Sequence, residues 1–530
     1  MVSSIDDTDT STHLLKLEDK LNRVLRTIKS SIDDTTYHKL LASGSRPGFL
    51  YGLPKIHKLG NPLRPIISAI GCFNYHLAKF LVPVLAPLTT NQFTIENSSS
   101  FNNDINSLNY HRPVTMCSFD IESLFTNVPL HETTDLIVNN TSTAQLESFG
   151  LNKKVFPKLL DIAAHHSVFS FEGSLYTQVD GVSMGSPIGP SYANSFLCHH
   201  ETTWLNDCPI SFKPIFYKRY IDDTFLIFEH QSHVQLFLDY LNSRHPSIKF
   251  TCEVEEEGKL SFLDTTITNN NGQFSTSTYR KKTFTGLGLH YLSFLPPIYK
   301  FNSIKTLLTR AYNVCSSWKA FHNEIVFLHD YFLYNGYPSQ LVDKTINTFL
   351  NRKLTPPPLP VTTVNKHVLY FKLPYMGKLS FEIRKSMKEI LKDAYPQIKF
   401  NFVFTNNISI GNFLKKISNP NPDLCSNVVY LFKCPSCPAR YVGSTSRWLK
   451  HRILEHRGKS FRTGATLGKP GFSSIRDHSH LHDHPFTSTD FQILSKHTNR
   501  LDLLISESLY INKMQPELNN QTTSTTLFTQ

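Results

Sequence analysis

The chain has 530 residues, 40% of them hydrophobic, which excludes a disordered protein and leaves room for two or more domains. Its net charge of +12 favours a polyanionic partner, nucleic acid first, although a basic surface can also serve solubility alone. Nine cysteines are too sparse for a disulfide scaffold, and we find neither a signal peptide nor an apolar run of the roughly 20 residues that span a membrane. We therefore expect a soluble, reduced, intracellular protein.

The predicted elements fall into five segments along the chain. Residues 1–45 form an N-terminal helical segment, in which Leu14, Leu17 and Leu21 recur at helical spacing. Residues 46–270 alternate short apolar runs with helical stretches and Pro/Gly turns, which is typical of an α+β domain. Residues 271–352 are mostly helical after one strand. Residues 353–424 are a proline-rich linker and a basic connector with one helix near 381–392, and residues 425–522 form a compact block.

Two adjacent acids stand between apolar and aromatic runs at Tyr220-Ile221-Asp222-Asp223. This pattern predicts a β-hairpin with both carboxylates at its tip, although the pair alone could be a polar turn. A third acid, Asp120, lies at the end of another apolar strand. Carboxylates from two neighbouring strands can bridge the two Mg²⁺ ions that nucleotidyl transfer uses. We therefore predict Asp120 and Asp222 as the principal metal ligands and Asp223 as a supporting one.

These segments resemble the palm motifs of reverse transcriptases, and more narrowly those of Penelope-like retroelements. The motifs run in order between residue 46 and about residue 300, at 51–58, 62–66, 118–129, 178–190 and 262–264. The resemblance implies an α+β right-hand polymerase with fingers and palm at 46–270 and a helical thumb at 271–352. It also implies an RNA template, a DNA primer and deoxynucleoside triphosphates as partners.

The same resemblance gives the residues around the acids individual roles. Lys55 and Arg64 would contact the triphosphate of the incoming nucleotide, because cationic groups suit phosphate oxygens. Gln178 would reach the sugar or phosphate of that nucleotide. Gly181 and Gly185 would let the backbone approach the substrate closely.

Three further assignments leave alternatives open. Phe125 would crowd the 2′ position of the incoming sugar and so select deoxynucleotides, or it is a plain core aromatic. Asp264 is expected to be structural, since a third carboxylate site is not needed. The thumb would grip a duplex backbone or present a solvated face with Lys281, Lys282, Tyr291 and Tyr299.

Five residues of the C-terminal block follow one another in an order that resembles the GIY-YIG nuclease family: Tyr430, Tyr441, Arg452, Glu507 and Asn519. The resemblance implies that Glu507 holds a single Mg²⁺ and that Arg452 stabilises the phosphate. The two tyrosines, with His456, would orient or deprotonate the attacking water, and Asn519 would help to close the site. Arg447 competes with Arg452 for the phosphate role, and Val428-Val429 stands where the family has Gly-Ile.

A C-x-x-C sequence, Cys434 to Cys437, lies in the loop between the two tyrosines and is a candidate zinc knuckle in a reduced compartment. Of the histidines that follow, His478 and His484 resemble the pair that Penelope-like nucleases use. We therefore predict a structural Zn²⁺ site of these two cysteines and two histidines. The alternatives are a redox-active C-x-x-C and a solvated histidine loop, and Cys425 is a less favoured ligand.

Together the two constellations predict the RNA-directed DNA polymerase of a retrotransposon, with an endonuclease that nicks target DNA to prime reverse transcription. A DNA substrate would place the protein in the nucleus, with no membrane partner. The alternatives are a domesticated, non-catalytic nucleic-acid-binding protein and an active polymerase with a degenerate nuclease. The first alternative should show erosion of the acids or of Arg452, and none of them is eroded.

Overall fold

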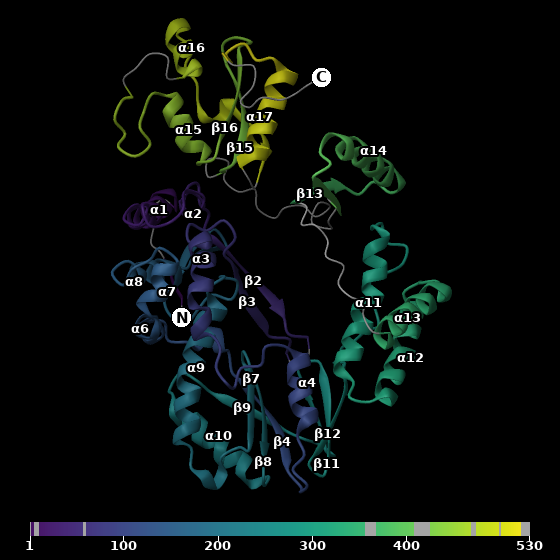
Figure 1. Ribbon diagram of the computed structural model, residues 1–530. Helices are drawn as coiled ribbons and strands as arrows, with labels where there is room; N and C mark the ends of the chain where they lie inside the picture. Colours follow the sequence, from purple (N-terminus) through teal and green to yellow (C-terminus); the bar gives the residue numbers. More distant parts are fainter. Residues whose placement is uncertain are drawn as a thin grey trace. The chain divides into compact units, whose positions relative to one another are not determined.

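The computed structural model describes residues 2–4, 10–56, 60–355, 367–406, 425–467, 473–497 and 500–520 (Figure 1). These residues form two compact units. Unit 1 comprises Met1–Asn91, Ser123–Thr202 and Lys416–Gln530, and unit 2 comprises Gln92–Glu122 and Thr203–Lys415. Within the described ranges, no helix is both long and apolar enough to cross a membrane.

The N-terminal part of unit 1 is a five-stranded sheet with helices. The strand order is β1-β6-β5-β2-β3, with β2 and β5 parallel and the other neighbours antiparallel. The strands are β1 (Val2–Ser4), β2 (Gly48–Pro54), β3 (Leu63–Ser68), β5 (Val168–Phe171) and β6 (Ser174–Gln178). The helices are α1 (Thr10–Arg26), α2 (Asp34–Leu40), α3 (Tyr75–Leu85), α5 (Leu124–Asn127), α6 (Leu130–Asn140), α7 (Thr143–Ser148), α8 (Phe156–Ala164) and α9 (Gly189–Asp207). The predicted N-terminal helix is confirmed, because α1 buries its leucines against the core of these helices.

Unit 2 begins with a four-stranded antiparallel sheet in the order β7-β8-β4-β9. Its elements are α4 (Ser98–Ser107), β4 (Thr115–Ile121), β7 (Phe216–Tyr220), β8 (Asp223–Phe228), α10 (Ser232–Arg244) and β9 (Phe250–Val254). Phe225 of β8 contacts Phe101 of α4, with ring centroids 5.3 Å apart, and Phe228 contacts Phe237 of α10 at 5.6 Å. Because successive side chains of a strand point to opposite faces, the sheet has a helix packed on each face.

A second sheet and three helices follow in unit 2. The sheet is formed by β10 (Lys259–Phe262), β11 (Thr265–Asn270) and β12 (Gln273–Thr278), and the helices are α11 (Pro297–Val314), α12 (Trp318–Tyr334) and α13 (Ser339–Leu354). The three helices share a core that includes Leu308, Phe332 and Val342. The mostly helical region predicted at 271–352 is therefore confirmed.

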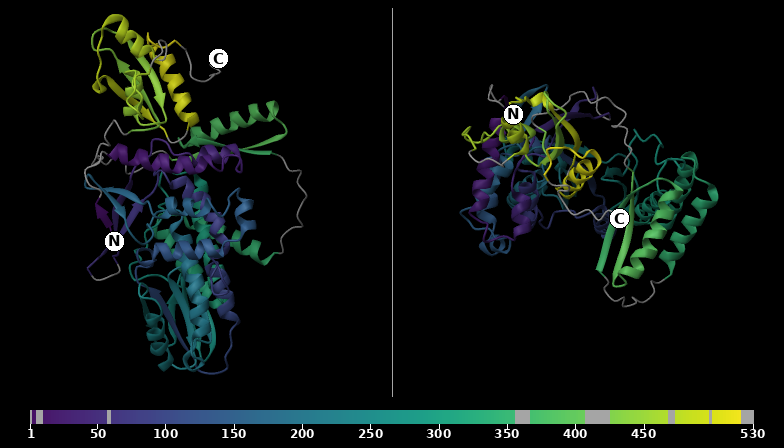
Figure 2. Two further views of the ribbon diagram at one scale, coloured as in Figure 1. Left: turned by 90° about the vertical axis from the view of Figure 1, so that its left-hand side faces the viewer. Right: turned by 90° about the horizontal axis from the view of Figure 1, so that it is seen from above.

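Residues 367–406 were predicted as part of a connector with one helix, and the structure adds two strands to it. β13 (His367–Pro374), α14 (Lys378–Ala394) and β14 (Ile398–Thr405) form a β-α-β unit whose two strands pair in parallel (Figure 2). An aromatic contact joins this β-α-β motif to the segment before α11, because the rings of Phe294 and Tyr375 lie 5.0 Å apart.

The C-terminal block of unit 1 is a three-stranded antiparallel sheet between helices. Its elements are β15 (Val428–Lys433), β16 (Arg440–Thr445), α15 (Leu449–His456), α16 (Ser474–His482), β17 (Phe491–Lys496) and α17 (Arg500–Met514). Tyr430 and Phe432 of the central strand β15 pack with α15, whereas Val429 and Leu431 pack with Leu503 of α17. Burial on both faces explains why β15 is a continuous apolar run.

Within unit 1 the C-terminal block contacts the N-terminal segment. The buried indole of Trp448 donates a 2.9 Å hydrogen bond from Nε1 to the carbonyl of Ser45, and Ser426 Oγ donates to the carbonyl of Gly44 at 2.6 Å. Gly44 has φ +65°, and a Cβ there would lie 2.6 Å from Ser426 Cβ. A side chain at this position would therefore disrupt the contact.

Candidate active sites

The predicted acidic hairpin is present in unit 2. Tyr220 of β7 pairs with Asp223 of β8, so that Ile221 and Asp222 form a two-residue turn. Ile221 has φ +57°, a conformation that a β-branched residue adopts only where the surroundings hold it. The turn brings both aspartates to the tip of the hairpin, as the sequence pattern predicts.

Asp120 lies beside this tip. It is the cross-strand partner of Asp223 in the antiparallel pairing of β4 with β8, which puts the two Cβ atoms about 5 Å apart. The backbone N–H of Ile121 donates to the carbonyl of Asp222 at 3.2 Å, so the turn is also tied to β4. The structure thus brings Asp120, Asp222 and Asp223 together at one end of the four-stranded sheet of unit 2, which we call the palm sheet.

The charges of the three acids act on one another. Burial, together with the neighbouring charges of Asp222 and Asp120, raises the pKa of Asp223 to about 6, against the opposing effect of Lys281. A bound divalent cation would relieve this repulsion, and carboxylate oxygens are the donors that Mg²⁺ prefers. The donor set therefore fits the metal that the resemblance implies.

Arg219 is a residue of this site that the sequence reading missed. Its side chain is only 1% exposed, and Nη1 donates a 2.9 Å hydrogen bond to the carbonyl of Ile221 at the hairpin tip. This hydrogen bond from a buried guanidinium holds the turn in place. The available signal was a second cation, next to Lys218, in a strand whose other residues are aromatic.

The two predicted triphosphate ligands lie on one hairpin of unit 1. Arg64 pairs with Leu53 across β2 and β3, and the backbone N–H of Lys55 donates to Pro62 at 2.9 Å, just beyond the strand ends. Arg64 is exposed and Lys55 is partly buried. Two residues of the same motif, His57 and Lys58, lie outside the described residues.

The loop after β6 is held tightly within unit 1. Gly181 has φ +76°, and a Cβ there would lie 2.5 Å from the carbonyl oxygen of Thr126; Gly185 has φ +120° and approaches the carbonyl of Ile67 in the same way. Gln178 is buried and accepts a 2.6 Å hydrogen bond from Ser183. The glycines therefore permit close backbone contacts within the protein, and Gln178 would have to leave Ser183 to reach a nucleotide.

Phe125 lies on α5 in the same unit. Its carbonyl accepts a 2.7 Å hydrogen bond from the N–H of Val182, and its ring packs partly buried against the unit 1 core. This is the contact that the core-aromatic interpretation expects, while part of the ring remains open to solvent.

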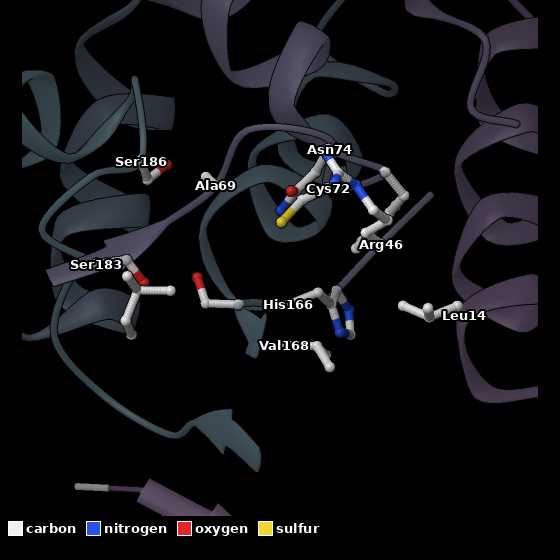
Figure 3. Close-up of a pocket in the computed structure, with 12 residues that line it drawn as sticks. Leu14, Arg46, Ala69, Cys72, Asn74, His166, Val168, Ser183 and Ser186 are labelled. Carbon is white, nitrogen blue, oxygen red and sulfur yellow. The ribbon is translucent and has the colours of Figure 1, made fainter. Parts of the chain in front are cut away.

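A small cavity lies behind the loop that carries Ser183 and Ser186 (Figure 3). Its volume is about 20 Å³, which holds one water molecule and excludes a nucleotide. Burial raises the pKa of Cys72, which lines the cavity, to about 12, so its thiol stays protonated at neutral pH. The cavity is therefore no second substrate site.

Asp264 and the segment after it belong to unit 2. One carboxylate oxygen of Asp264 accepts a 2.9 Å hydrogen bond from Nε of Arg310 on α11. This ion pair joins the second sheet to the helices, in keeping with the structural role expected for Asp264.

In the C-terminal block, a hydrogen-bonded chain runs through the predicted site. Tyr430, which is fully buried, lies with its hydroxyl 2.8 Å from Nε2 of His456, and Nδ1 of His456 lies 2.6 Å from Ser473 Oγ. Arg452 Nε donates to the Tyr430 hydroxyl at 3.3 Å. Burial, with a smaller effect of Arg452, lowers the pKa of His456 to about 3, so the imidazole is neutral at neutral pH and is a weak base.

Glu455 is the second residue that sequence reasoning missed. It accepts a 3.0 Å hydrogen bond from Arg452 and two from Arg447, at 2.6 and 2.9 Å. Although burial acts in the opposite direction, the two arginines lower the pKa of Glu455. Arg447 thus pairs with both oxygens of Glu455, whereas Arg452 also reaches the hydroxyl of Tyr430, which favours Arg452 for the phosphate role.

The remaining predicted nuclease residues lie on neighbouring elements. Glu507 of α17 is buried and accepts a 2.9 Å hydrogen bond from Ser444 Oγ of β16. Asn519 bonds both the N–H and the carbonyl of Val442, at 2.9 and 2.8 Å. The rings of Tyr430 and Tyr441 lie 6.4 Å apart, and a Cβ at Gly443 would come within 2.7 Å of both side chains. Glycine at this position therefore leaves room for both tyrosines.

Cys434, Cys437, His478 and His484 converge in the same block, with their ligand atoms within 4.8 Å of one another. Cys434 Sγ lies 3.5 Å from His484 Nδ1, Cys437 Sγ lies 3.4 Å from His478 Nε2, and the two histidine nitrogens are 3.4 Å apart. Usual zinc bond lengths at tetrahedral angles require about 3.5 Å between sulfur and nitrogen and about 3.3 Å between two nitrogens. The four side chains thus fit Zn²⁺, whereas Cys425 lies outside this set, near Lys496.

Comparisons with known proteins agree with part of this picture. Residues 56–264 match the family model of reverse transcriptases (RNA-dependent DNA polymerases), and residues 287–347 match that of the animal helix-turn-helix domain. No curated protein matches the chain. The helix-turn-helix match covers α11, α12 and most of α13, the region expected to be a thumb.

Solved structures with some similarity are polymerases. Telomerase from Candida albicans, in complex with a fragment of telomeric RNA, shares 13% identity over 58% of this chain and 59% of that chain, with a TM-score of 0.40. The apo telomerase from Candida tropicalis (13%, 58% and 58%, TM-score 0.35) and the Sicinivirus 3Dpol RNA-dependent RNA polymerase (12%, 60% and 71%, TM-score 0.36) are also similar. The chain spans about three fifths of the length of the telomerases it matches. Likeness at this level carries no further weight.

The acidic hairpin, the neighbouring Asp120 and the family match over the same segment agree with one another. The chain therefore carries a reverse transcriptase domain at residues 56–264, followed by an animal helix-turn-helix domain at residues 287–347.

Proposed function

We propose that this protein is an RNA-directed DNA polymerase that extends a DNA primer by two-metal nucleotidyl transfer. The observation that carries the proposal is the pairing of Asp120 with Asp223 beside the hairpin tip, inside the segment that matches reverse transcriptases. Asp120 and Asp222 would hold two Mg²⁺ ions, with Asp223 in support, and bound metal would neutralise the negative charge of the reacting phosphates. Arg219 holds the turn in place, and Lys55 and Arg64 would bind the triphosphate.

Primer extension tests this proposal directly. With Mg²⁺, a primed RNA template and deoxynucleotides, we expect Asp222→Asn to lower the extension rate about a thousandfold, because the variant keeps its shape but loses a metal ligand. Asp239→Asn on α10 is the matched control, since this exposed carboxylate accepts a hydrogen bond from Gln235 on the same helix, and the substitution should leave the rate unchanged. Equal rates for Asp222→Asn and the wild type would refute the assignment.

We further propose that the C-terminal block nicks target DNA and so supplies the primer, as in a Penelope-like element with a GIY-YIG nuclease. The specific support is the cluster of Tyr430, His456 and Arg452 together with the buried Glu507, which would hold one Mg²⁺. Val428 and Val429 are fully buried, so their replacement of Gly-Ile changes packing rather than a reactive group. A DNA target would require nuclear residence.

Conversion of supercoiled plasmid to the open circle measures nicking. Glu507→Gln keeps an acceptor for Ser444 but removes the charge, and it should slow nicking about a hundredfold or more. Glu517→Gln is the control, since Glu517 is exposed and pairs only with Arg440 among the described contacts. A wild-type chain that extends primers but leaves plasmid intact would instead favour an active polymerase with a degenerate nuclease.

The four converging ligands support a structural Zn²⁺ in this block. Purified protein should contain one zinc per chain by elemental analysis, and the double change Cys434→Ser with Cys437→Ser should remove it. Zinc content that is unaffected by these substitutions would place the metal elsewhere.

A further inference from the structure

The two-stranded sheet of β13 and β14 has one covered face and one open face. The rings of Phe371 and Phe402 stack at 5.6 Å, and Phe404 contacts Phe381 of α14 at 5.2 Å. In parallel strands, paired residues share a face, and successive residues of a strand alternate between faces. Phe371, Phe402 and Phe404 therefore lie on the face toward α14, and the residues next to them in sequence point away from α14. Within the described part of the chain, β13 and β14 pair with no other strand.

The open face carries aromatic and basic side chains. It consists of three cross-strand pairs: Val368 with Lys399, Tyr370 with Asn401, and Lys372 with Val403. Tyr370 is 68% exposed and Val368 is 42% exposed, and both lysines are exposed. A tyrosine ring thus stands in water between two cations, and none of the six residues is acidic.

A basic cleft lies at the start of β14 on the side of the sheet that faces α14, and it meets the open face at Lys399. It has a volume of about 330 Å³ and is lined by Lys388, Lys392, Pro396, Ile398, Lys399 and Phe400. Lys388 and Lys392 are one turn apart on α14, and Lys399 belongs to both the cleft and the open face. Residues 367–405 contain seven Lys and Arg against three Asp and Glu, so the charge is concentrated here.

We propose that the open face and the adjoining cleft together form a binding surface for single-stranded nucleic acid, outside the polymerase site. Lysines would contact successive phosphates, and an unpaired base would stack on Tyr370, as aromatic platforms for single strands do. A duplex could use the lysines but would leave the tyrosine without a partner, because its bases are already stacked. A protein partner is disfavoured because the cores of protein interfaces are depleted in lysine.

Binding of a labelled, unstructured 20-nucleotide RNA to the full-length protein, followed by fluorescence anisotropy without deoxynucleotides, tests the proposal. The double variant Tyr370→Ala with Lys399→Glu should bind at least about tenfold more weakly and show a smaller salt dependence. Both side chains are exposed, so an unchanged melting temperature would verify that the variant is folded. The same sequence is also tested as single-stranded DNA and as a blunt duplex, to show which type of strand the protein prefers. Of the three nucleic acids, the duplex should lose the least affinity when the wild type is replaced by the double variant.

The control is Lys153→Glu with Lys154→Glu, two exposed cations of unit 1, which should change the affinity less than twofold. Photocrosslinking with RNA that contains 4-thiouridine should label peptides within residues 367–405. Wild-type affinity in the double variant would overturn the proposal, and so would crosslinks confined to peptides outside residues 367–405. A double variant that no longer self-associates but binds RNA as the wild type does would also overturn it. Asp222→Asn should bind this RNA normally, so failure here is distinguishable from failure of the polymerase assignment.

Discussion

The palm site and the C-terminal block differ in how their buried charges are compensated. In the palm, burial and repulsion among three carboxylates raise the pKa of Asp223 to about 6. In the C-terminal block, Glu455 is neutralised by Arg447 and Arg452, and the proposed catalytic side chains are already hydrogen-bonded to one another. The acids of the palm thus repel one another and would be neutralised by the proposed Mg²⁺, whereas Glu455 of the block is neutralised by arginines of the protein itself. Substitutions in the palm should therefore cost activity without stability, and substitutions in the block should cost both.

Loss of the proposed Zn²⁺ should have the largest effect and should separate the two regions. Cys434→Ser would detach the β15–β16 loop from α16, with a loss of several kcal/mol in the stability of the block. Differential scanning calorimetry should show a lower melting temperature, and plasmid nicking should disappear while primer extension stays within about twofold of wild type. A parallel loss of extension would mean that the two regions are not independent in this respect.

Glu455→Gln should have the next largest effect. The change leaves the partly buried Arg447 and Arg452 without their counter-charge, which should destabilise the block by about 3 kcal/mol and misplace Arg452. Urea denaturation measures the first effect, and nicking should fall about a hundredfold. Glu517→Gln, which removes an exposed carboxylate, should do neither.

A pH series tests the buried imidazole. Because the folded pKa of His456 is about 3 and the unfolded value is about 6.5, only the unfolded state takes up this proton between those values. The stabilising contribution of the neutral imidazole should therefore be fully present above pH 6.5. Below that pH, the free energy of unfolding should fall by about 1.4 kcal/mol per pH unit. His451, with a folded pKa of about 4, adds to the slope. In His456→Gln the stability curve between pH 7 and pH 5 should be flatter, and an unchanged slope would contradict the assignment.

The smallest effect is expected in the palm. In buffer without divalent cations, Asp223→Asn removes one of three repelling charges and should leave the protein as stable as wild type or more stable by about 1 kcal/mol. Primer extension with Mg²⁺ should nevertheless decrease. A clear fall in melting temperature would show that Asp223 is held by favourable contacts and would remove the contrast between the two regions.

Local patterns in the sequence predicted the acidic hairpin, but they did not predict features that depend on contacts between distant residues. The acidic hairpin was predictable because its turn and its apolar flanks are adjacent in the chain. Arg219 and Glu455 were missed because a charged residue shows its role only when its burial and its partners are known. The strands β13 and β14 were missed because their parallel pairing crosses a helix, and β13 lacks a regular alternation of apolar and polar residues.

The pairing of Asp120 with Asp223 also has a consequence for biosynthesis. The two residues are roughly a hundred positions apart, so this contact has a high sequence separation and closes slowly. A ribosome must release β8 before β4 can acquire its neighbour, and until then β4 presents an unpaired edge that can aggregate. A nascent chain that stops short of β8 therefore contains many of the sequence motifs of a polymerase but no assembled catalytic centre.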